Sequence, residues 1–183
     1  MRSEAFASHL GSLALNFTAT VRQRGGRPEE RLPAPADLAR WLHEADLTPP
    51  DATPTPAEHQ AALRLREAIY AAATAVLSDT PPNPADIATI NEASKADRRI
   101  PQLDPTTLTK TYRQPKAPIA AALATIADDA ITALTTDRAH LAVCEDETCG
   151  ALIRLNPRGP RRRWCSMAAC GNRHKVATYR TRH

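Results

Sequence analysis

All four cysteines of this 183-residue chain lie in its last forty residues, as two matched pairs, Cys144/Cys149 and Cys165/Cys170. Four residues separate the members of each pair, and fifteen residues separate the two pairs. This spacing is typical of a four-thiolate zinc site, because a tetrahedral ion needs two short chelating loops joined by a segment long enough to fold back. Four thiolates leave no coordination position for an activated water. The pattern therefore predicts one structural Zn²⁺ that has no catalytic role.

Other roles of the cysteines remain open at this point. The chain begins without the apolar stretch of a secretory signal, and no apolar run approaches the roughly eighteen residues of a membrane span. We therefore expect a cytoplasmic protein with no membrane segment, in which paired cysteines are more often metal ligands than disulfides. His140 and His174 are alternative ligands, although four cysteines already complete the set. A thiol redox sensor that loses its zinc on oxidation is a further alternative.

The positive charge of the chain is concentrated around the same cysteines. From Cys144 to His183 there are nine arginines and lysines against three acidic residues, and no acidic residue follows Glu147, whereas the net charge of the whole chain is only +4. Such an unopposed positive region attracts polyanions, because each cation can neutralise a phosphate and release condensed counterions. The residues expected to contact DNA are Arg158, Arg161, Arg162, Arg163, Arg173, Lys175 and Arg180.

The amino-terminal region is predicted to be helical, with a core of small residues. Alanine supplies much of the 42% hydrophobic fraction, and aromatic residues reach only 4%. Apolar residues spaced by three and four from Phe6 to Val21 predict a first helix that ends at Gly25-Gly26. Thr55-Pro56-Ala57-Glu58 combines a cap, a proline at the first helical position and a returning carboxylate, which predicts a helix to about Leu77. Further helices are predicted over 38–45, 83–90 and 118–134.

Short β elements are expected at two places. The β-branched alternation of residues 108–113 favours one or two short strands. Residues 151–155 and 161–164 flank a turn-rich pentapeptide and predict a β-hairpin between the cysteine pairs, and Ser166 is a candidate cap for a helix that runs to about Arg180. We therefore expect a mainly α fold with a small β component (α+β): a helical domain over 1–138 and a treble-clef zinc finger over 139–183.

Three segments resemble two known families. The run Arg162-Arg163-Trp164-Cys165-Ser166-Met167-x-x-Cys170-Gly171-Asn172-Arg173-x-Lys175-Val176 resembles the signature of CGNR-type zinc-finger proteins. Leu13-Ala-Leu-Asn-Phe17 and Asp37-Leu-Ala-Arg-Trp-Leu42 resemble the opening of the ABATE-type domain that such proteins usually carry, which is described as a stress-induced transcription regulator. The resemblance implies that the four cysteines bind zinc and that the chain regulates transcription.

Together these observations favour a zinc-dependent, DNA-binding transcription regulator whose amino-terminal domain senses a signal or dimerises. The alternative is a protein-interaction adaptor with a purely structural zinc module, and RNA binding is a third reading. Arg173 either reaches base edges or holds the zinc knuckle. A homodimer and an unknown small-molecule effector remain open as partners. No Ser/His/Asp ordering, phosphate-binding glycine loop or paired-carboxylate site stands out, so we do not expect an enzyme.

Overall fold

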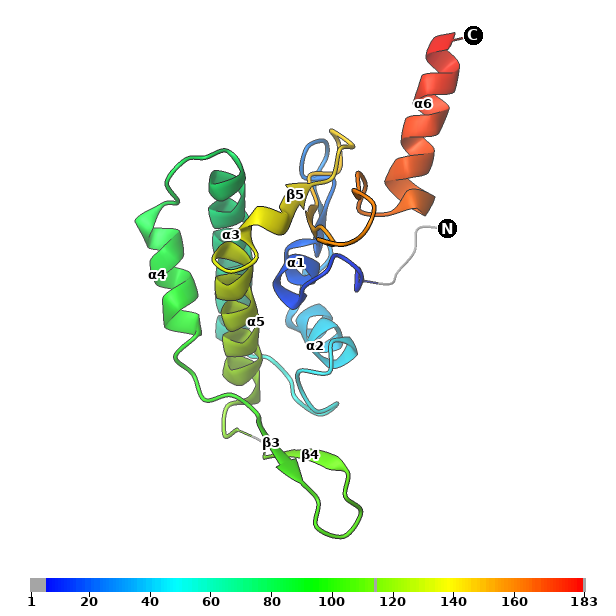
Figure 1. Cartoon of the computed structure of the whole chain (residues 1–183). Helices are drawn as coiled ribbons and strands as arrows, with labels where there is room; N and C mark the ends of the chain where they lie inside the picture. The colour runs from blue at the N-terminus through cyan, green and yellow to red at the C-terminus, as the bar shows by residue number, and fades with distance from the viewer. Residues whose placement is uncertain (1–5, 114, 183) are drawn as a thin grey trace.

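The computed structural model describes residues 6–113 and 115–182, with side chains through Tyr179. The chain folds into a mainly helical body with a small β component, as predicted, and in the described residues this component consists of three antiparallel hairpins (Figure 1). The long helix α3 (Pro56–Leu77) packs beside α4 (Pro84–Ala93) and α5 (Pro118–Leu134). The short helices α1 (Leu13–Thr18) and α2 (Pro35–Glu44) cover the other side of this layer.

Local capping signals explain where the long helices begin. At α3 the Thr55 hydroxyl accepts a hydrogen bond from the Glu58 amide at 3.2 Å, and the Glu58 carboxylate accepts one from the Thr55 amide at 2.8 Å. At α4 the side chain of Asn83 accepts from the Ala85 amide at 2.9 Å. Because these partners satisfy amides that the helix itself leaves unpaired, both starts follow from a few adjacent residues, and the prediction of these two helices is confirmed.

Alanines dominate the contact between the central helices. Ala62 and Ala72 of α3 and Ala122 and Ala127 of α5 are almost fully buried. Small side chains let two helix backbones approach closely, and the larger apolar residues then fill the rim of the contact. The larger side chains of this main core include Phe17, Leu38, Trp41, Leu42, Leu65, Ile69, Ile90 and Ile126.

The long first helix predicted from Phe6 to Val21 is wrong. Only α1 is helical, and it begins after Ser12, whose side chain accepts a hydrogen bond from the Leu15 amide. Residues 6–11, which we call the strap, run in a non-helical conformation because the Leu10 carbonyl accepts a hydrogen bond from the Arg154 amide at 2.7 Å. Gly11 has φ +103°, and a Cβ there would lie 2.6 Å from the Cβ of Arg154.

Two hairpins belong to the amino-terminal part. Strand β1 (Val21–Arg22) pairs with β2 (Glu29–Glu30), in a stretch where the sequence predicted the end of a helix. Strand β4 (Lys110–Arg113) falls within the predicted strand region and pairs with β3 (Ile100–Leu103). The β3–β4 hairpin projects from the lower end of the helical layer (Figure 1).

The cysteine-rich end begins with a 3₁₀ turn (Arg138–His140) and the strands β5 (Leu141–Val143) and β6 (Leu152–Arg154). These two strands pair with each other, so the hairpin predicted between residues 151–155 and 161–164 is wrong. The cysteine knuckle forms the turn between β5 and β6, so β6 pairs with the strand that precedes it in the sequence and not with the segment that follows it. Residues 161–164 form no strand, and the Arg163 carbonyl accepts a hydrogen bond from the Glu145 amide at 2.9 Å.

The final helix α6 (Asn172–Arg182) follows one turn of π-helix (Met167–Gly171). The predicted side-chain cap by Ser166 is absent, because the Ser166 carbonyl instead accepts a hydrogen bond from the Gly171 amide at 3.0 Å. In the cartoon α6 extends away from the rest of the molecule (Figure 1). Among the described residues, no helix combines the length and the apolar character needed to cross a bilayer.

The helical body and the cysteine-rich end share a hydrophobic core. Leu152 and Ile153 of β6 and Leu141 of β5 are buried against Leu10 of the strap and Leu15 of α1. This second core also includes Ala73 of α3 and Ala133 of α5. The β5–β6 hairpin therefore depends on the helices for the burial of its apolar side chains.

Candidate metal centre

The fold brings the four cysteines together. Cys144 and Cys149 lie in the knuckle between β5 and β6, and Cys165 and Cys170 lie in the turn that leads into α6. All four Sγ atoms lie within 4.8 Å of one another, with 3.6 Å between Cys149 and Cys165 and 3.4 Å between Cys165 and Cys170. Zn–S bonds of about 2.3 Å in a tetrahedron require sulfurs roughly 3.8 Å apart, whereas a disulfide requires about 2.05 Å. The cluster therefore fits one tetrahedral ion and contains no disulfide.

The electrostatics of the cluster also call for a cation. A hydrogen bond from the Cys165 thiol lowers the pKa of Cys149 to about 5. The same hydrogen bond and burial raise the pKa of Cys165, and burial raises the pKa of Cys170. Sulfurs this close cannot all be thiolates unless a positive charge lies between them. A divalent ion replaces the protons and supplies that charge.

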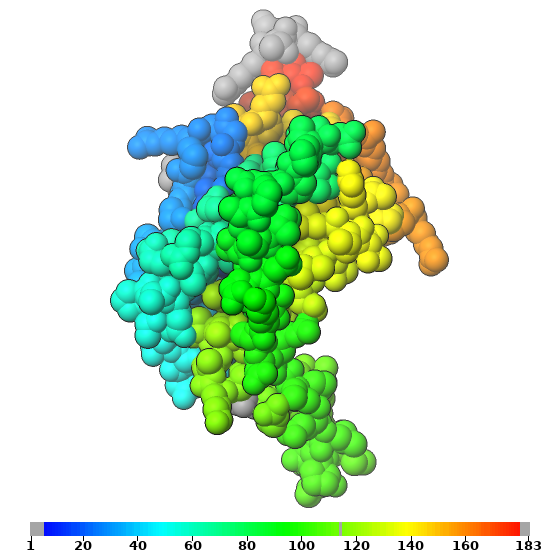
Figure 2. Space-filling model, turned by 90° about the vertical axis from the view of Figure 1, so that its left-hand side faces the viewer, coloured from blue at the N-terminus to red at the C-terminus, as the bar shows by residue number. Residues whose placement is uncertain are grey.

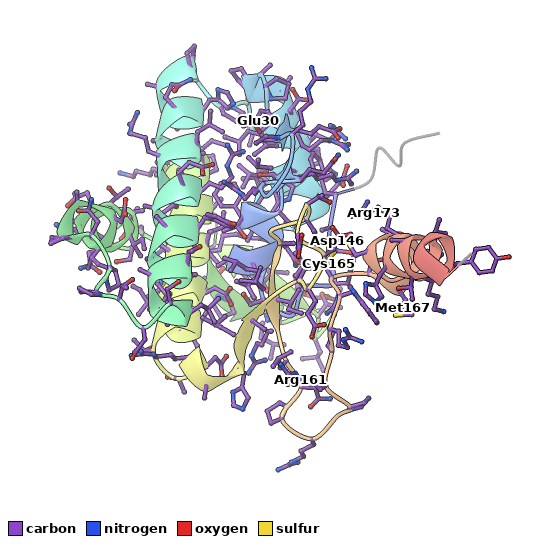
Figure 3. All side chains as sticks on the ribbon, turned by 90° about the horizontal axis from the view of Figure 1, so that it is seen from above. Glu30, Asp146, Arg161, Cys165, Met167 and Arg173 are labelled. Carbon is purple, nitrogen blue, oxygen red and sulfur yellow. The ribbon has the colours of Figure 1, made fainter. Side chains whose placement is uncertain are left out.

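Hydrogen bonds around the sulfurs fix their positions. The Cys165 amide donates to Cys144 Sγ at 3.3 Å, and Arg173 Nη2 donates to Cys170 Sγ at 3.0 Å. The Nε atom of Arg173 donates to Asp146 Oδ2 at 2.8 Å. In Figure 3 Asp146, Cys165 and Arg173 lie close together at the base of α6. Arg173 therefore links the first cysteine loop to the second, which is the structural role that the sequence left open for it.

Asp146 is a functional residue that the sequence analysis did not single out. Its Oδ1 atom accepts hydrogen bonds from the Thr148 amide at 3.1 Å and the Thr148 hydroxyl at 2.7 Å. Burial raises the pKa of the Asp146 carboxyl, but the hydrogen bonds from Thr148 and Arg173 outweigh burial and leave the pKa lowered. Asp146 thus stays ionised and shapes the knuckle from inside.

The helical body holds the knuckle from the opposite side. The Arg24 amide donates to the Cys149 carbonyl at 3.1 Å, and the Tyr70 hydroxyl donates to the Gly150 carbonyl at 3.0 Å. Gly25 approaches so closely that a Cβ there would lie 1.9 Å from the Glu147 carbonyl oxygen. The zinc knuckle is therefore docked on α3 and on the β1–β2 turn through contacts to its own backbone.

Three of the residues predicted to contact DNA have free side chains. Arg158, Arg161 and Lys175 are exposed, and within the part of the chain that the structure describes their side chains make no hydrogen bond or ion pair. We call these three residues the free basic set. Figure 3 shows Arg161 on a loop that extends away from the body. The side chain of Arg180, also predicted to contact DNA, lies outside the described residues.

Arg162, in contrast, is used inside the fold. Its Nε atom donates to the Trp164 carbonyl at 2.9 Å, and one Nη atom donates to the Cys165 carbonyl. The other Nη atom donates to the His9 carbonyl of the strap at 2.8 Å. The contact with His9 joins residues that are far apart in the sequence, so no local pattern signals it. Arg162 is thus bound to backbone and not directed at solvent.

Arg163 is also paired. Its Nε atom donates to the Glu145 carboxylate at 2.6 Å, and its guanidinium lies 4.5 Å from the centre of the Trp164 ring. His140 and His174, the alternative ligands, do not join the metal cluster, which consists of the four cysteines among the described residues. The ring of His174 instead packs against Trp164, with 5.5 Å between ring centroids.

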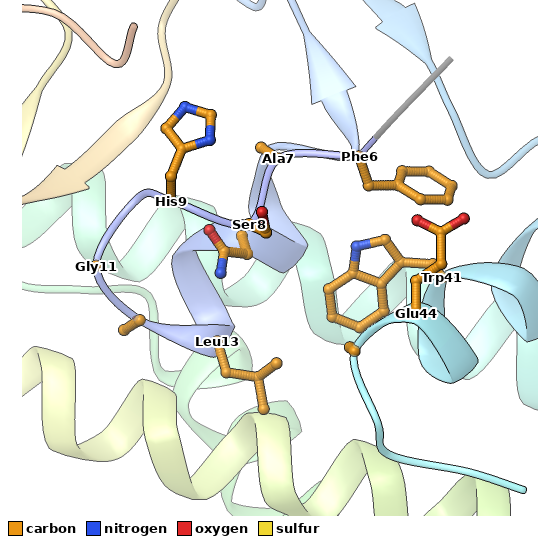
Figure 4. A pocket seen from close by; sticks show the side chains of 11 residues that line it. Phe6, Ala7, Ser8, His9, Gly11, Leu13, Trp41 and Glu44 are labelled. Carbon is orange, nitrogen blue, oxygen red and sulfur yellow. The ribbon is translucent and has the colours of Figure 1, made fainter. Parts of the chain in front are cut away.

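A cavity of about 820 Å³ lies between the strap and α2 (Figure 4). Phe6, Trp41 and Leu13 supply apolar walls, and Asn16 and Glu44 supply polar groups. Strap residues that line this cavity are adjacent to the carbonyls that bind Arg162 and Arg154. The strap therefore connects the cavity to the cysteine-rich end: its residues line the cavity, and its carbonyls accept hydrogen bonds from Arg162 and Arg154.

Comparisons with known proteins identify both halves of the chain. The family model of ABATE, whose description is "Putative stress-induced transcription regulator", matches residues 11–137. The family model of the CGNR zinc finger matches residues 140–183. A search of curated proteins finds no match. The clustered cysteines and the zinc-finger match together identify the ion as one Zn²⁺, held by the four thiolates.

Proposed function

Because the chain belongs to the family of ABATE-domain proteins with a carboxy-terminal CGNR zinc finger, we propose that it is a zinc-dependent transcription regulator that binds duplex DNA. The zinc ion has a structural role in this proposal, since four thiolates close its coordination sphere and leave no site for catalysis. Reduced cysteines of this kind suit a protein that acts in the cytoplasm, where bacterial-type regulators meet DNA.

The observation that carries the proposal is the free basic set. The acidic residues Glu145 and Asp146 of the knuckle are neutralised by Arg163 and Arg173, whereas Arg158, Arg161 and Lys175 have no internal counterion in the described chain. The set lies on the two parts of the finger that extend from the body, the loop before Trp164 and helix α6. Exposed cations without partners are the groups that gain most from phosphate contacts.

Helix α6 is the element that we place in the major groove. It is long enough to lie in a groove that admits one α-helix, and its main contacts are with the π turn that precedes it. Arg173 and His174 face the zinc module, so Lys175 and Val176 are the residues that we assign to base edges. Arg158 and Arg161 would then position the finger through backbone phosphates.

We assign the sensing role to the cavity of Figure 4. A small molecule that fills the space between the strap and α2 contacts Phe6 and Trp41 through their rings and Asn16 and Glu44 through polar groups. Displacement of the strap would then reach the finger through the hydrogen bond between the His9 carbonyl and Arg162. The effector in this proposal changes how firmly the finger is held.

A DNA-binding assay on the whole zinc-loaded chain tests the proposal, because the finger shares its core with the helices and is not tested in isolation. Wild-type protein is compared with the triple variant Arg158→Ala, Arg161→Ala, Lys175→Ala by fluorescence anisotropy over a salt series. The control triple variant Arg40→Ala, Lys95→Ala, Arg138→Ala removes the same charge from side chains that pair with acids elsewhere.

We expect the first variant to lose affinity and about two units of the salt slope, one for each of the phosphate contacts of Arg158 and Arg161, and the control to keep both. Zinc-loaded wild-type protein that fails to bind duplex DNA at low salt would overturn the proposal. Equal losses in both triple variants would show binding through net charge alone. A stronger competition by single-stranded RNA than by duplex DNA would favour RNA as the partner.

A protein-interaction adaptor is the second candidate, and one observation favours it. Met167, Val176 and Tyr179 of the finger are large apolar side chains that are exposed. In an adaptor these residues would contact a protein partner, and the zinc would only hold their scaffold. Substitution of Val176 by Ala separates the two candidates. If Val176 reads bases, the variant should have a changed sequence preference for DNA. If Val176 contacts a protein partner, the variant should bind DNA no differently from the wild-type protein.

A further inference from the structure

Three of the four cysteines line a second cavity, which has a volume of about 770 Å³. This cavity lies between the strap, strand β1 and residues 165–170, which we call the second cysteine loop. The cysteines in its wall are Cys149, Cys165 and Cys170, whereas Cys144 does not contribute. A space of this size admits a small molecule. The sulfurs of the metal centre are therefore within reach of a reagent that enters the cavity.

The cavity opens to solvent between the strap and the second cysteine loop. Its wall includes His9 of the strap and Ala168 and Ala169 of the loop, and all three residues are exposed. On the face of the molecule shown in Figure 2, in contrast, the helical body covers most of the surface, with α4 in front and the orange segment before α6 at the right-hand edge. A small molecule therefore has a route to the sulfurs that does not cross the helical body.

Cys165 is the least buried of the four cysteines. Cys144, Cys149 and Cys170 are 4%, 9% and 1% exposed, and all three are buried. Cys165 is only partly buried. The susceptibility of a cysteine to oxidation increases with its exposure. Burial therefore favours Cys165 as the sulfur that an oxidant in the cavity meets first.

Hydrogen bonds distinguish Cys165 from the other cysteines in the same way. Cys170 Sγ accepts a hydrogen bond from Arg173 at 3.0 Å, and Cys144 Sγ accepts one from the Cys165 amide at 3.3 Å. Cys149 accepts one from the backbone of the second residue after it. Within the described chain, no N–H group donates to Cys165 Sγ, whose hydrogen-bond partners are other sulfurs. Because an N–H donor stabilises a thiolate and makes it a weaker nucleophile, Cys165 keeps the most reactive sulfur of the four.

The surroundings of Cys165 also suit the two steps of disulfide formation. Arg22 of β1 lines the cavity and interacts electrostatically with Cys165. A positive charge there stabilises an anion that leaves from the sulfur. Cys165 Sγ lies 3.4 Å from Cys170 Sγ and 3.6 Å from Cys149 Sγ. Two sulfurs are thus close enough to attack an oxidised Cys165.

The sequence left a thiol redox sensor open, and we propose that Cys165 is its reactive sulfur: hydrogen peroxide oxidises Cys165 first, and the disulfide that follows empties the zinc site. In the first step Cys165 Sγ attacks one peroxide oxygen, the O–O bond breaks, and a sulfenic acid forms as hydroxide leaves. In the second step Cys149 or Cys170 Sγ attacks the oxidised sulfur, the S–S bond forms, and a second hydroxide leaves. Two thiolates lose two electrons in total, and one hydrogen peroxide is reduced to two hydroxides.

Oxidation at Cys165 acts on the helix that follows it. A disulfide removes two of the four ligands, so the site no longer holds the ion. The β5–β6 hairpin keeps Leu152 and Ile153 in the core that it shares with the helices. Helix α6, in contrast, has its main contacts with the π turn that contains Cys170, so the loss of the metal loosens α6. The effect on DNA rests on the proposed function, whereas the oxidation itself does not and is tested without DNA.

Treatment of the full zinc-loaded chain with less than one equivalent of hydrogen peroxide tests this proposal. Dimedone traps the first sulfenic acid, and peptide mass spectrometry locates the adduct. A parallel sample without dimedone shows which cysteines form disulfides, and a chromophoric chelator follows the release of zinc. We expect Cys165 to carry at least ~5-fold more adduct than any other cysteine, because it is the most accessible sulfur. The disulfides should contain Cys165, and zinc should be released in step with them.

A variant that narrows the cavity tests the route to Cys165. Ala169 is exposed in the cavity wall, so Ala169→Trp is compatible with folding and replaces no ligand. We expect this variant to release zinc at least ~3-fold more slowly under peroxide, because the added ring limits access to the sulfur. Ala71→Trp makes the same change at an exposed position of α3 and should react at the wild-type rate. Far-UV circular dichroism and the initial zinc content verify that both variants are folded.

Three results would overturn this proposal. The first is an adduct that is spread evenly over the four cysteines or is concentrated on a cysteine other than Cys165. The second is a chain that keeps its zinc in peroxide that oxidises free cysteine. The third is an equal rate of zinc release from wild-type protein and Ala169→Trp. Selective oxidation of Cys165 in a chain that never binds duplex DNA would instead support this proposal and contradict only the proposed function.

Discussion

Asp146 and Arg173 connect the two cysteine loops, because the Nε atom of Arg173 donates to Asp146 at 2.8 Å while its Nη2 atom donates to Cys170 Sγ at 3.0 Å. One guanidinium thus contacts a carboxylate in the first loop and a sulfur in the second. An arginine in this position orients zinc ligands and stabilises their negative charge. The motif residue Arg173 is therefore part of the metal centre.

Substitution of Arg173 by Ala or of Asp146 by Asn should weaken zinc binding by about 10–100-fold, as is typical when hydrogen-bonding partners of metal ligands are removed. Competition with a chromophoric zinc chelator measures the affinity. Arg158→Ala, on the exposed loop, serves as the control with the same charge change as Arg173→Ala. Unchanged zinc affinity in both centre variants would show that Arg173 and Asp146 have no part in holding the metal.

Gly25→Ala should undock the knuckle from the β1–β2 turn. A Cβ at Gly25 would lie 1.9 Å from the Glu147 carbonyl oxygen, whereas a Cβ at Gly26 would lie 3.3 Å from the Thr148 side chain. We expect Gly25→Ala to reduce the free energy of unfolding by about 1–3 kcal/mol through overpacking, and Gly26→Ala to reduce it by less. Urea unfolding of the two neighbouring variants checks this, and equal effects would refute the close approach.

The ion pair between Arg66 and Glu30 should make the stability depend on pH. Arg66 is buried and donates to both Glu30 oxygens, at 2.7 and 2.6 Å. Burial raises the pKa of Glu30, but the hydrogen bonds from Arg66 outweigh it and leave the pKa lowered. The carboxylate therefore contributes stability above its unfolded pKa of about 4.3, and this contribution disappears as the pH falls through the lower folded pKa.

Glu30→Gln tests this pH dependence. We expect the variant to be less stable than wild type by about 1–2 kcal/mol at pH 7, a value limited by the partial exposure of Glu30, and the difference to shrink below about pH 4. Glu92→Gln, at an exposed ion pair with Lys95, is the control and should change stability little at any pH. A wild-type advantage over Glu30→Gln that persists at acidic pH would contradict the assignment.

Arg162 and Arg161 are neighbours that should respond oppositely to substitution. Arg162→Lys keeps the charge but loses hydrogen bonds to the His9 and Cys165 carbonyls, so stability should fall while the salt slope of DNA binding is kept. Arg161→Ala should leave the melting temperature unchanged and reduce the salt slope by about one unit. Thermal melts and salt titrations of the two variants check this, and a reversed pattern would exchange the roles of the two arginines.

The features that the sequence predicted correctly depend on signals between neighbouring residues. The start of α3 is encoded by Thr55, Pro56 and Glu58, and the four sulfurs of the zinc site are marked by their spacing. The resemblance of the segment from Arg162 to Val176 to the CGNR signature also predicted the family, which the match over residues 140–183 confirms.

The features that the sequence did not predict depend on contacts between distant segments. The helical periodicity from Phe6 to Val21 is real, but the strap is not helical because its Leu10 carbonyl accepts a hydrogen bond from the amide of Arg154 on β6. The strand partner of β6 is β5, because the knuckle itself makes the turn. The arginines of the finger looked alike in the sequence, and only their three-dimensional partners separate Arg162 from Arg161.

The most direct test of the whole account is zinc K-edge X-ray absorption on the freshly purified, reduced full-length protein, with the metal content measured on the same sample. The account predicts one zinc per chain with four sulfur neighbours at about 2.3 Å. Nitrogen or oxygen atoms in the coordination shell, or the absence of stoichiometric zinc, would contradict it.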